Sequence, residues 1–180
     1  PELQDEIRDA GVRAAVAADY TSAGTVEFIY KDGKFYFMEM NTRIQVEHCV
    51  SEMYANCDIL RRQIEVAMGK KLDLAQDDVV FKGHAIECRV NAEDPLNDFA
   101  PTPGTVNAYE APGGPGVRVD SAAFDGFKIS PFYDSMIAKL ICWDEDRNRC
   151  IARVQRALNE FVIKGVKTTI PFHQRMMRNT

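Results

Sequence analysis

The stretch that decides the fold is Thr25–Asn41, TVEFIYKDGKFYFMEMN. Its two halves are rich in β-branched and aromatic residues, which favour strands. Between them stands Lys31-Asp32-Gly33, and an Asp-Gly pair between two such runs is a strong signal for a hairpin turn. The sequence therefore predicts two antiparallel strands joined by a tight turn.

Helices and further strands are predicted on both sides of this hairpin. Apolar residues recur at helical spacing over residues 2–20, and a second helix is predicted between a cap at Asp58 and an end at Gly69. Strand-like runs follow at 83–90, 116–120 and 135–143, and helical spacing returns over 147–162, stopped by Gly165. This order predicts an α+β fold with an antiparallel sheet.

Composition excludes several classes of protein. The 180 residues carry a formal net charge of -5, which gives no general attraction to nucleic acid or to anionic membranes. No apolar run approaches the roughly 20 residues that cross a bilayer. The five cysteines include no CxxC pair and no zinc-like spacing, so we expect mostly buried thiols in a reducing compartment.

Polar residues occupy every second position after the hairpin, at Glu39, Asn41, Arg43, Gln45 and Glu47. If this segment is extended, all five side chains point to one side. An amphipathic edge strand would show the same alternation. The mixture of acids, amides and a guanidinium is more typical of a row that binds a ligand.

Glu27 stands among apolar residues of the first strand, where a carboxylate is costly unless it is paired. A three-residue connection would pair Lys31 with Phe35 and set Glu27 opposite Glu39. Two facing carboxylates repel each other unless a cation lies between them, and Mg²⁺ is the usual cation for hard oxygen ligands. A metal–nucleotide site and a solvent-screened surface pair are about equally consistent with this pattern.

At these residues the sequence resembles biotin carboxylase, the ATP-grasp component of biotin-dependent carboxylases. The resemblance covers essentially the whole chain in six blocks: AGTVEFIY (23–30), FYFMEMNTRIQVEH (35–48), GHAIECRVNAEDP (83–95), APGGPGVRVDS (111–121), YDSMIAKLI (133–141) and GVKTTIPFH (165–173). It implies the C-terminal portion of an ATP-grasp domain at 1–82 and the C-terminal subdomain of biotin carboxylase at 83–180.

The resemblance implies a role for each residue of the alternating row. Glu27 and Glu39, with Asn41 beside them, would hold Mg²⁺ (or Mn²⁺) against the phosphates of ATP. Bicarbonate would lie against Arg43, Gln45 and the backbone of Val46, where a guanidinium fork suits a small oxyanion. Glu47 would act as the general base that deprotonates bicarbonate.

Further residues are implied on the biotin side. Arg89 would stabilise the enolate of biotin, although a structural salt bridge to Glu87 or Glu93 is the alternative for an isolated arginine. Tyr133 and Asp134 lie in the YDSM turn and would support the biotin-binding side.

The resemblance also implies partners and a compartment. Biotin would be presented on a biotin carboxyl carrier protein or domain, and a separate carboxyltransferase would use the product, with acetyl-CoA, propionyl-CoA, methylcrotonyl-CoA or pyruvate as the final acceptor. No nucleic-acid or membrane partner is expected. Pro115 replaces an aromatic residue of a known dimer contact, so we discount a homodimer. The expected location is the cytoplasm, or a mitochondrial matrix or plastid in a eukaryote.

Two departures and two alternatives complete the sequence interpretation. Cys49 replaces a proline after VEH, and a buried inert thiol is favoured there over a reactive one. The chain starts within a helical pattern, so we expect a piece of a longer protein that is inactive alone.

Another ATP-grasp ligase, such as carbamoyl-phosphate synthetase, would share the glutamates, but the QVEH and RVNAEDP blocks argue against it. A non-catalytic docking or assembly module is the other alternative.

Overall fold

The computed structural model describes residues 2–179, and the chain divides into two compact units. The first unit runs to His48 and includes Asn56–Val80, whereas the second comprises Cys49–Ala55 and the chain from Phe81 onward. Helices and antiparallel strand pairs make up both units, which confirms the predicted α+β class. No helix in the described range has the length and apolar character needed to span a bilayer.

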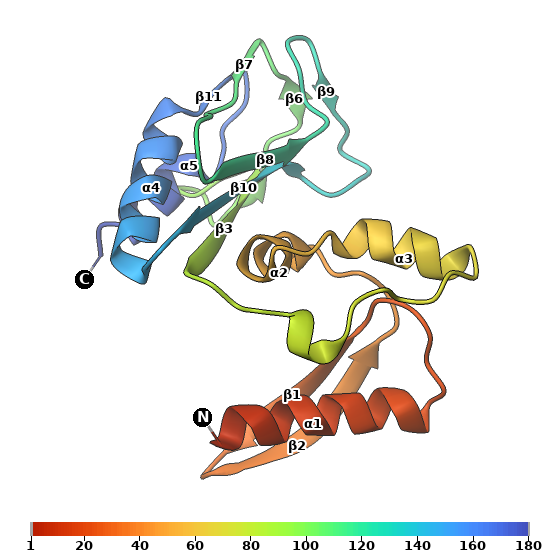
Figure 1. The fold of residues 1–180 in the computed structure, drawn as a ribbon. Helices are drawn as coiled ribbons and strands as arrows, with labels where there is room; N and C mark the ends of the chain where they lie inside the picture. The colour runs from red at the N-terminus through yellow and green to blue at the C-terminus, as the bar shows by residue number, and fades with distance from the viewer. Residues whose placement is uncertain (1, 180) are drawn as a thin grey trace. The chain divides into compact units, whose positions relative to one another are not determined.

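The first unit is built on a two-stranded ribbon of β1 (Thr25–Lys31) and β2 (Lys34–Asn41). Helix α1 (Glu2–Ala17) runs along this ribbon (Figure 1). Its Gly11 faces Val26 of β1, where an added Cβ would lie 3.9 Å from the Val26 Cβ. The predicted first helix is therefore confirmed, although it ends at Ala17.

The hairpin pairs Glu27 with Glu39 as predicted, but its turn is shorter than predicted. Its turn has only two residues, because Lys31 pairs with Lys34, and Asp32 and Gly33 both have positive φ, at 51° and 79°. Asp-Gly is suited to such a turn because both residues tolerate this conformation. The predicted pairing of Lys31 with Phe35 is therefore wrong.

A β-bulge restores the predicted pair of glutamates. Phe28 pairs with Phe37 and Glu27 pairs with Glu39, so Met38 is an extra residue on β2. Without the bulge, the two-residue turn would place Met38 opposite Glu27. A bulge reverses the face of the ribbon to which the next residues point. Phe37 and Phe28 therefore point to one face of the ribbon, and Glu39 and Glu27 point to the other. The Phe28 and Phe37 ring centroids lie 6.3 Å apart.

Two more helical elements complete the first unit: α3 (Ile59–Ala67) and the 3-10 turn η1 (Gln76–Asp78). The predicted cap of α3 is confirmed, since an Asp58 carboxylate oxygen accepts a hydrogen bond from the Arg61 backbone N–H at 2.8 Å. Gly69, with φ of 80°, follows the end of the helix as predicted.

The second unit centres on a three-stranded antiparallel sheet with the order β3 (His84–Asn91), β10 (Met136–Asp144), β8 (Val117–Ser121). The same unit contains three separate two-stranded antiparallel sheets: β4 (Glu93–Asp94) with β5 (Ala100–Pro101), β6 (Gly104–Thr105) with β9 (Lys128–Ile129), and β7 (Ala108–Glu110) with β11 (Val162–Lys164). Helix α4 (Arg147–Glu160) packs beside β10 and β3 (Figure 1).

The core of the second unit forms between this sheet and α4. Leu140 on β10 and Leu158 on α4 are fully buried, and Val90 and Val154 lie with them in one cluster. Four of the five cysteines are also buried, as predicted. Burial raises the pKa of Cys88 and of Cys142 to about 12, so these thiols act as small apolar side chains.

Sequence periodicity missed several short elements. No element was predicted over helix α2 (His48–Ala55) or helix α5 (Ile170–Met176), and the helix predicted over 147–162, with its stop at Gly165, extended into β11. Helix α4 ends at Glu160, and Gly165, with φ of 100°, instead ends β11. Elements of three to eight residues are too short to show a helical or strand period.

Candidate functional site

The polar end of the β1–β2 hairpin brings three of the predicted metal ligands together. Glu27 and Glu39 face each other across the ribbon. The Asn41 amide nitrogen donates hydrogen bonds to Glu27 at 2.8 Å and to Glu39 at 3.1 Å. One amide therefore joins the two carboxylates that the sequence predicted to converge.

The predicted extended row ends at Asn41, because β2 ends there and residues 42–47 form a loop. The expectation that all five side chains alternate on one strand is therefore wrong. The loop nevertheless brings Gln45 back, and its amide nitrogen donates to the same Glu27 oxygen at 3.0 Å. Chain reversal, rather than strand alternation, places Gln45 beside Glu27.

Arg43 lies on the exposed side of this loop. Its guanidinium donates to the Ile44 carbonyl at 3.2 Å and to the Asn41 amide oxygen at 3.4 Å. Val46 and Glu47 form the turn before α2, with Glu47 exposed and Val46 half-buried. These contacts leave the Arg43 guanidinium directed along its own loop and accessible to a small anion.

The donor set fits a hard divalent cation. Two carboxylates and an amide oxygen are ligands that Mg²⁺ accepts, together with water and phosphate oxygens. The nitrogen and oxygen of an amide are assigned from hydrogen bonding, and rotation of Asn41 by half a turn would direct its oxygen toward the carboxylates. Glu27, Glu39 and Asn41 could therefore hold such an ion at the open end of the ribbon.

Arg89 lies on β3 in the second unit, 52% exposed in its side chain. Its Nε atom is 3.7 Å from a carboxylate oxygen of Glu87, so the predicted salt bridge exists but is long. Its backbone carbonyl accepts a hydrogen bond from the Thr169 hydroxyl at 2.9 Å and lies 2.8 Å from the His173 Nε2 atom. Two contacts therefore hold the backbone carbonyl of Arg89, and about half of its side chain is exposed.

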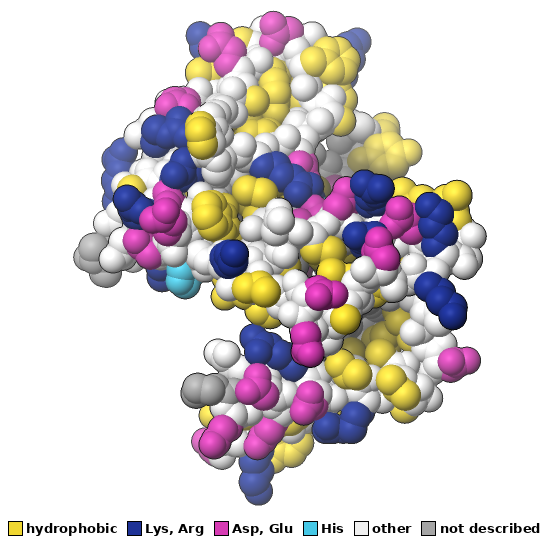
Figure 2. All heavy atoms as spheres, in the orientation of Figure 1, with side chains coloured by type: hydrophobic (Ala, Val, Ile, Leu, Met, Phe, Trp, Pro, Cys, Tyr) yellow, Lys and Arg dark blue, Asp and Glu magenta, His cyan; other side chains and the backbone are white. Residues whose placement is uncertain are grey.

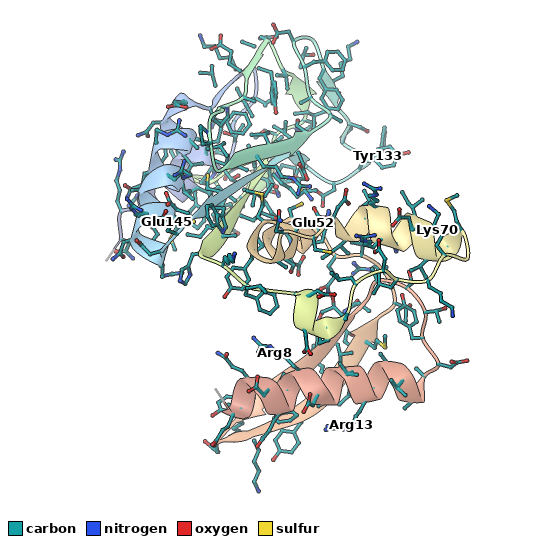
Figure 3. All side chains as sticks on the ribbon, viewed as in Figure 1. Arg8, Arg13, Glu52, Lys70, Tyr133 and Glu145 are labelled. Carbon is teal, nitrogen blue, oxygen red and sulfur yellow. The ribbon has the colours of Figure 1, made fainter. Side chains whose placement is uncertain are left out.

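Tyr133 and Asp134 lie on the loop between β9 and β10. Tyr133, labelled in Figure 3, projects outward and is 84% exposed. An Asp134 carboxylate oxygen accepts a hydrogen bond from the Met136 backbone N–H at 2.8 Å. Asp134 therefore shapes the turn, and both residues are exposed.

A partly buried ionic cluster in the second unit was not predicted. Cys49 on α2 donates to Asp120 at 3.1 Å and accepts from the Lys139 amine at 2.8 Å. Arg118 donates to Asp120 and to Glu52, each at 2.7 Å (Figure 3 labels Glu52). Burial raises the pKa of the Cys49 thiol even though the Lys139 hydrogen bond opposes this, which favours the inert thiol over the reactive one.

Comparisons with protein families match both segments of the chain. Residues 1–75 match the family described as carbamoyl-phosphate synthase L chain, ATP binding domain. Residues 87–180 match the family described as biotin carboxylase C-terminal domain. The second match is specific to biotin carboxylases and covers more than half of the chain.

Individual relatives support the same assignment. The chain is 56% identical to biotin carboxylase 1 of Bacillus subtilis over 180 residues, covering 99% of this chain and 40% of the relative. It is also 56% identical to a pyruvate carboxylase subunit from Methanothermobacter thermautotrophicus over 179 residues, covering 99% of this chain and 36% of the relative. The chain thus spans about two fifths of the length of the curated relatives it matches.

A solved structure matches the whole fold. The biotin carboxylase domain of the Hydrogenobacter thermophilus 2-oxoglutarate carboxylase, a dimer in complex with MgADP, ADP and bicarbonate, superposes with a TM-score of 0.96 at 48% identity. The match covers 100% of this chain and 40% of that chain.

Fold and sequence together define the class as the C-terminal part of an ATP-grasp domain followed by a biotin carboxylase C-terminal domain. The chain belongs to the biotin carboxylase family. The alternative of a carbamoyl-phosphate synthetase explains the match of the first segment but not that of the second.

Proposed function

We propose that this chain supplies the metal and bicarbonate side of an enzyme that carboxylates biotin with ATP and bicarbonate. The observation that carries the proposal is the convergence of Glu27, Glu39, Asn41 and Gln45 at one end of the hairpin. A solvent-screened pair of surface glutamates would not require two amides directed at one carboxylate. The boundary between the ATP-grasp part and the C-terminal subdomain is proposed at residues 82 and 83.

Glu27, Glu39 and Asn41 would hold Mg²⁺ or Mn²⁺ together with the phosphates of ATP. The ion, when bound, neutralises negative charge on the phosphate oxygens during phosphoryl transfer. The carboxylates are half-buried or exposed, so they remain accessible to ATP at the open end of the ribbon. The relative from Hydrogenobacter thermophilus, which was solved with MgADP, supports this proposal.

Arg43, Gln45 and the backbone of Val46 bind bicarbonate in the proposed mechanism. Glu47 removes the proton of bicarbonate, and the resulting oxygen attacks the γ-phosphoryl group of ATP to give carboxyphosphate and ADP. Carboxyphosphate then separates into CO₂ and phosphate. Its phosphate takes the N1 proton of biotin, and the enolate of biotin captures the CO₂.

Arg89 stabilises the biotin enolate in this scheme, because a fixed cation placed where negative charge develops lowers the barrier. The two contacts on its backbone carbonyl support this role, since they fix the strand position from which the guanidinium extends. Tyr133 and Asp134 contribute to the biotin-binding side.

Biotin reaches the enzyme on a carrier protein or domain, and a carboxyltransferase uses carboxybiotin in the next step. The relatives include proteins named for pyruvate carboxylase and for 2-oxoglutarate carboxylase, so their names do not single out acetyl-CoA as the final acceptor. A cytoplasmic location, or an organelle matrix in a eukaryote, is the proposed setting.

A substitution at Arg43 tests the bicarbonate assignment in an enzyme of full family length. Arg43→Lys retains the charge but loses the bidentate fork, so we expect the KM for bicarbonate to rise by roughly tenfold or more. The matched control is Arg13→Lys on the exposed surface of α1 (Figure 3), which should leave the KM unchanged. An unchanged KM in both variants would remove Arg43 from the bicarbonate site.

The 180-residue chain is expected to show no biotin-dependent ATP turnover by itself. Its described residues provide the metal and anion ligands, but the chain has only about two fifths of the length of the curated relatives it matches. Phosphate release measured with biotin, bicarbonate and MgATP would check this expectation. Sustained turnover by the purified chain would contradict it.

A further inference from the structure

A groove of about 950 Å³ lies in the second unit, apart from every residue assigned to the reaction. Helix α5 lines it, together with the segment Val166–Thr168 that leads into α5. Pro95 and Leu96, in the turn after β4, line it as well. All of these elements belong to one compact unit, so the groove is a feature of that unit alone.

Apolar side chains line the groove without closing it. Ile163, Val166 and Phe172 are half-buried, and the Phe172 ring is supported edge-on by Phe99 at a centroid distance of 5.1 Å. Leu96 and Met176, which also line the groove, remain 90% and 49% exposed. Large apolar side chains gathered around a depression mark a site of interaction rather than an ordinary solvated surface.

The charges around the groove are mainly positive, although the chain as a whole carries a net charge of -5. Lys167, Arg175 and Arg178 line it, with Asp94 as the single lining carboxylate. Lys167 is already paired with Asp94 at 2.5 Å. Within residues 2–179, neither Arg175 nor Arg178 makes a side-chain hydrogen bond or an ion pair. Two guanidinium groups beside an apolar groove are therefore available to an acidic occupant.

The openness of the groove distinguishes between two kinds of occupant. Small-molecule sites typically enclose about 70–90% of the ligand surface. A small anion bound to the arginines would leave the apolar side chains of Leu96 and Met176 exposed. A protein segment that lays an apolar face in the groove can cover them and place acidic residues near the arginines, in the way helices bind to grooves.

We infer that this groove binds an amphipathic, acidic segment of a partner protein, with apolar side chains on Phe172, Val166 and Leu96 and carboxylates on Arg175 and Arg178. The inference is independent of the proposed catalytic role, because no residue of the groove takes part in that role. The two arginines determine that the partner segment is acidic, and the exposed apolar side chains of Leu96 and Met176 favour a protein segment over a small molecule.

The 180-residue chain can be titrated with synthetic helical peptides of about 18 residues, with an apolar stripe of helical period. One peptide carries glutamates beside the stripe, and a matched peptide carries lysines at the same positions. We expect the acidic peptide to bind at least about tenfold more tightly, and more weakly in high salt. Amide chemical-shift changes should map to residues 94–96 and 163–179.

Double substitution Arg175→Glu with Arg178→Glu should weaken binding of the acidic peptide by at least about tenfold. The control Arg147→Glu makes the same kind of charge change on the exposed start of α4, outside the groove, and should leave binding unchanged. Unaltered thermal unfolding of both variants would show that the fold is retained.

Several outcomes would overturn the inference. Equal affinity for the two peptides, or no binding at about 1 mM, would exclude an acidic partner segment as the occupant of the groove. Dodecanoate serves as the small-molecule probe. If it displaces the acidic peptide and has the higher affinity of the two, the groove is a small-molecule site instead. The sedimentation coefficient can also be measured at increasing chain concentration. If it rises, and Arg175→Glu abolishes the rise, a second copy of this chain is the occupant.

Discussion

The two units of the chain differ in how completely each buries its own apolar side chains. In the second unit, Leu140 and Leu158 are completely buried between the β3-β10-β8 sheet and α4. In the first unit, none of the described residues is fully enclosed. Many of its large apolar side chains are exposed: Val12, Val16, Ile29, Tyr30, Tyr36, Phe37, Met38, Leu60, Ile64 and Met68. Yellow, apolar side chains reach the surface of this unit in Figure 2.

This difference separates the source of stability from the proposed chemistry. A two-stranded ribbon is marginally stable in water, whereas three strands covered by a helix can sustain a core. The first unit carries the proposed metal ligands at the end of such a ribbon and the proposed bicarbonate ligands on the loop that follows it. The second unit carries Arg89 on a strand with a complete core. We therefore expect substitutions in the two units to have different consequences, and four comparisons test this.

The largest expected effect concerns catalysis in an enzyme of full family length. Glu39→Gln should lower both ATP cleavage and biotin carboxylation by roughly 10²–10³-fold, because it weakens a ligand needed for phosphoryl transfer. Arg89→Ala should lower biotin carboxylation by a similar factor but leave bicarbonate-dependent ATP cleavage within a few-fold. Assays of ADP release and carboxybiotin formation measure the two steps. Equal losses of both steps in Arg89→Ala would contradict the role assigned to it.

A matched pair of leucine truncations tests the difference in burial. Leu140→Ala empties a fully buried position, so we expect it to lower the free energy of unfolding by about 3 kcal/mol. Leu72→Ala in the first unit, where the side chain is 54% exposed, should cost less than about 0.5 kcal/mol. Trp143, the single tryptophan, lies on β10 and reports urea unfolding of the second unit. A large effect of Leu72→Ala on that transition would show that the two units unfold together.

The ionic cluster of the second unit should make its stability depend on pH. Burial raises the pKa of Asp120, but the hydrogen bonds from Arg118 and Cys49 more than offset this and hold it below its usual 3.8. A lowered carboxyl pKa contributes stability above the unfolded value, and this contribution is lost as the pH falls through the folded pKa. Stability should therefore decline below about pH 4.

Arg118→Gln should cost about 2 kcal/mol at pH 7, because it leaves the buried Glu52 carboxylate without its close ionic partner. It should also reduce the loss of stability on acidification that Asp120 contributes. Thermal unfolding at pH 7 and pH 3 measures both effects. If stability falls as steeply on acidification in the variant as in the parent, carboxylates other than Asp120 are responsible.

The smallest expected effect compares the helix caps of the two units. Asp146 accepts from the Arg149 backbone N–H at 2.9 Å at the start of α4, as Asp58 does at the start of α3. Asp146→Ala should lower the stability of the second unit by about 1 kcal/mol. Asp58→Ala should leave the Trp143 transition unchanged and instead speed hydrogen exchange of the α3 amides. A shift of that transition by Asp58→Ala would show that α3 contributes to the stability of the second unit.

Local signals in the sequence predicted much of this fold. The Asp-Gly pair predicted the hairpin, Asp58 and Gly69 predicted the limits of α3, and apolar runs predicted β3, β8 and β10. These features depend on residues close together in the chain. The short helices α2 and α5 were missed because their formation depends on packing within the folded unit, as Cys49 and Ile170 show by their burial.

The candidate site was predicted in its members but not in its geometry. Glu27 and Glu39 were expected to face each other, yet the two-residue turn alone would have paired Glu27 with Met38. Gln45 was expected on a continued strand, and it approaches Glu27 through a loop. The ionic cluster around Arg118 gave no sequence signal, because its members lie between 2 and 90 residues apart.

Sequence by itself determined the family, the hairpin and the identity of the polar side chains, because these follow from motifs and from preferences of neighbouring residues. Tertiary structure alone decided that a bulge at Met38 turns Glu39 toward Glu27, that the loop after Asn41 returns Gln45 to the same carboxylate, and that Arg175 and Arg178 border an open groove. The physical reason is that each of these depends on hydrogen bonds and packing between segments distant in the chain, whose free energy no local pattern encodes.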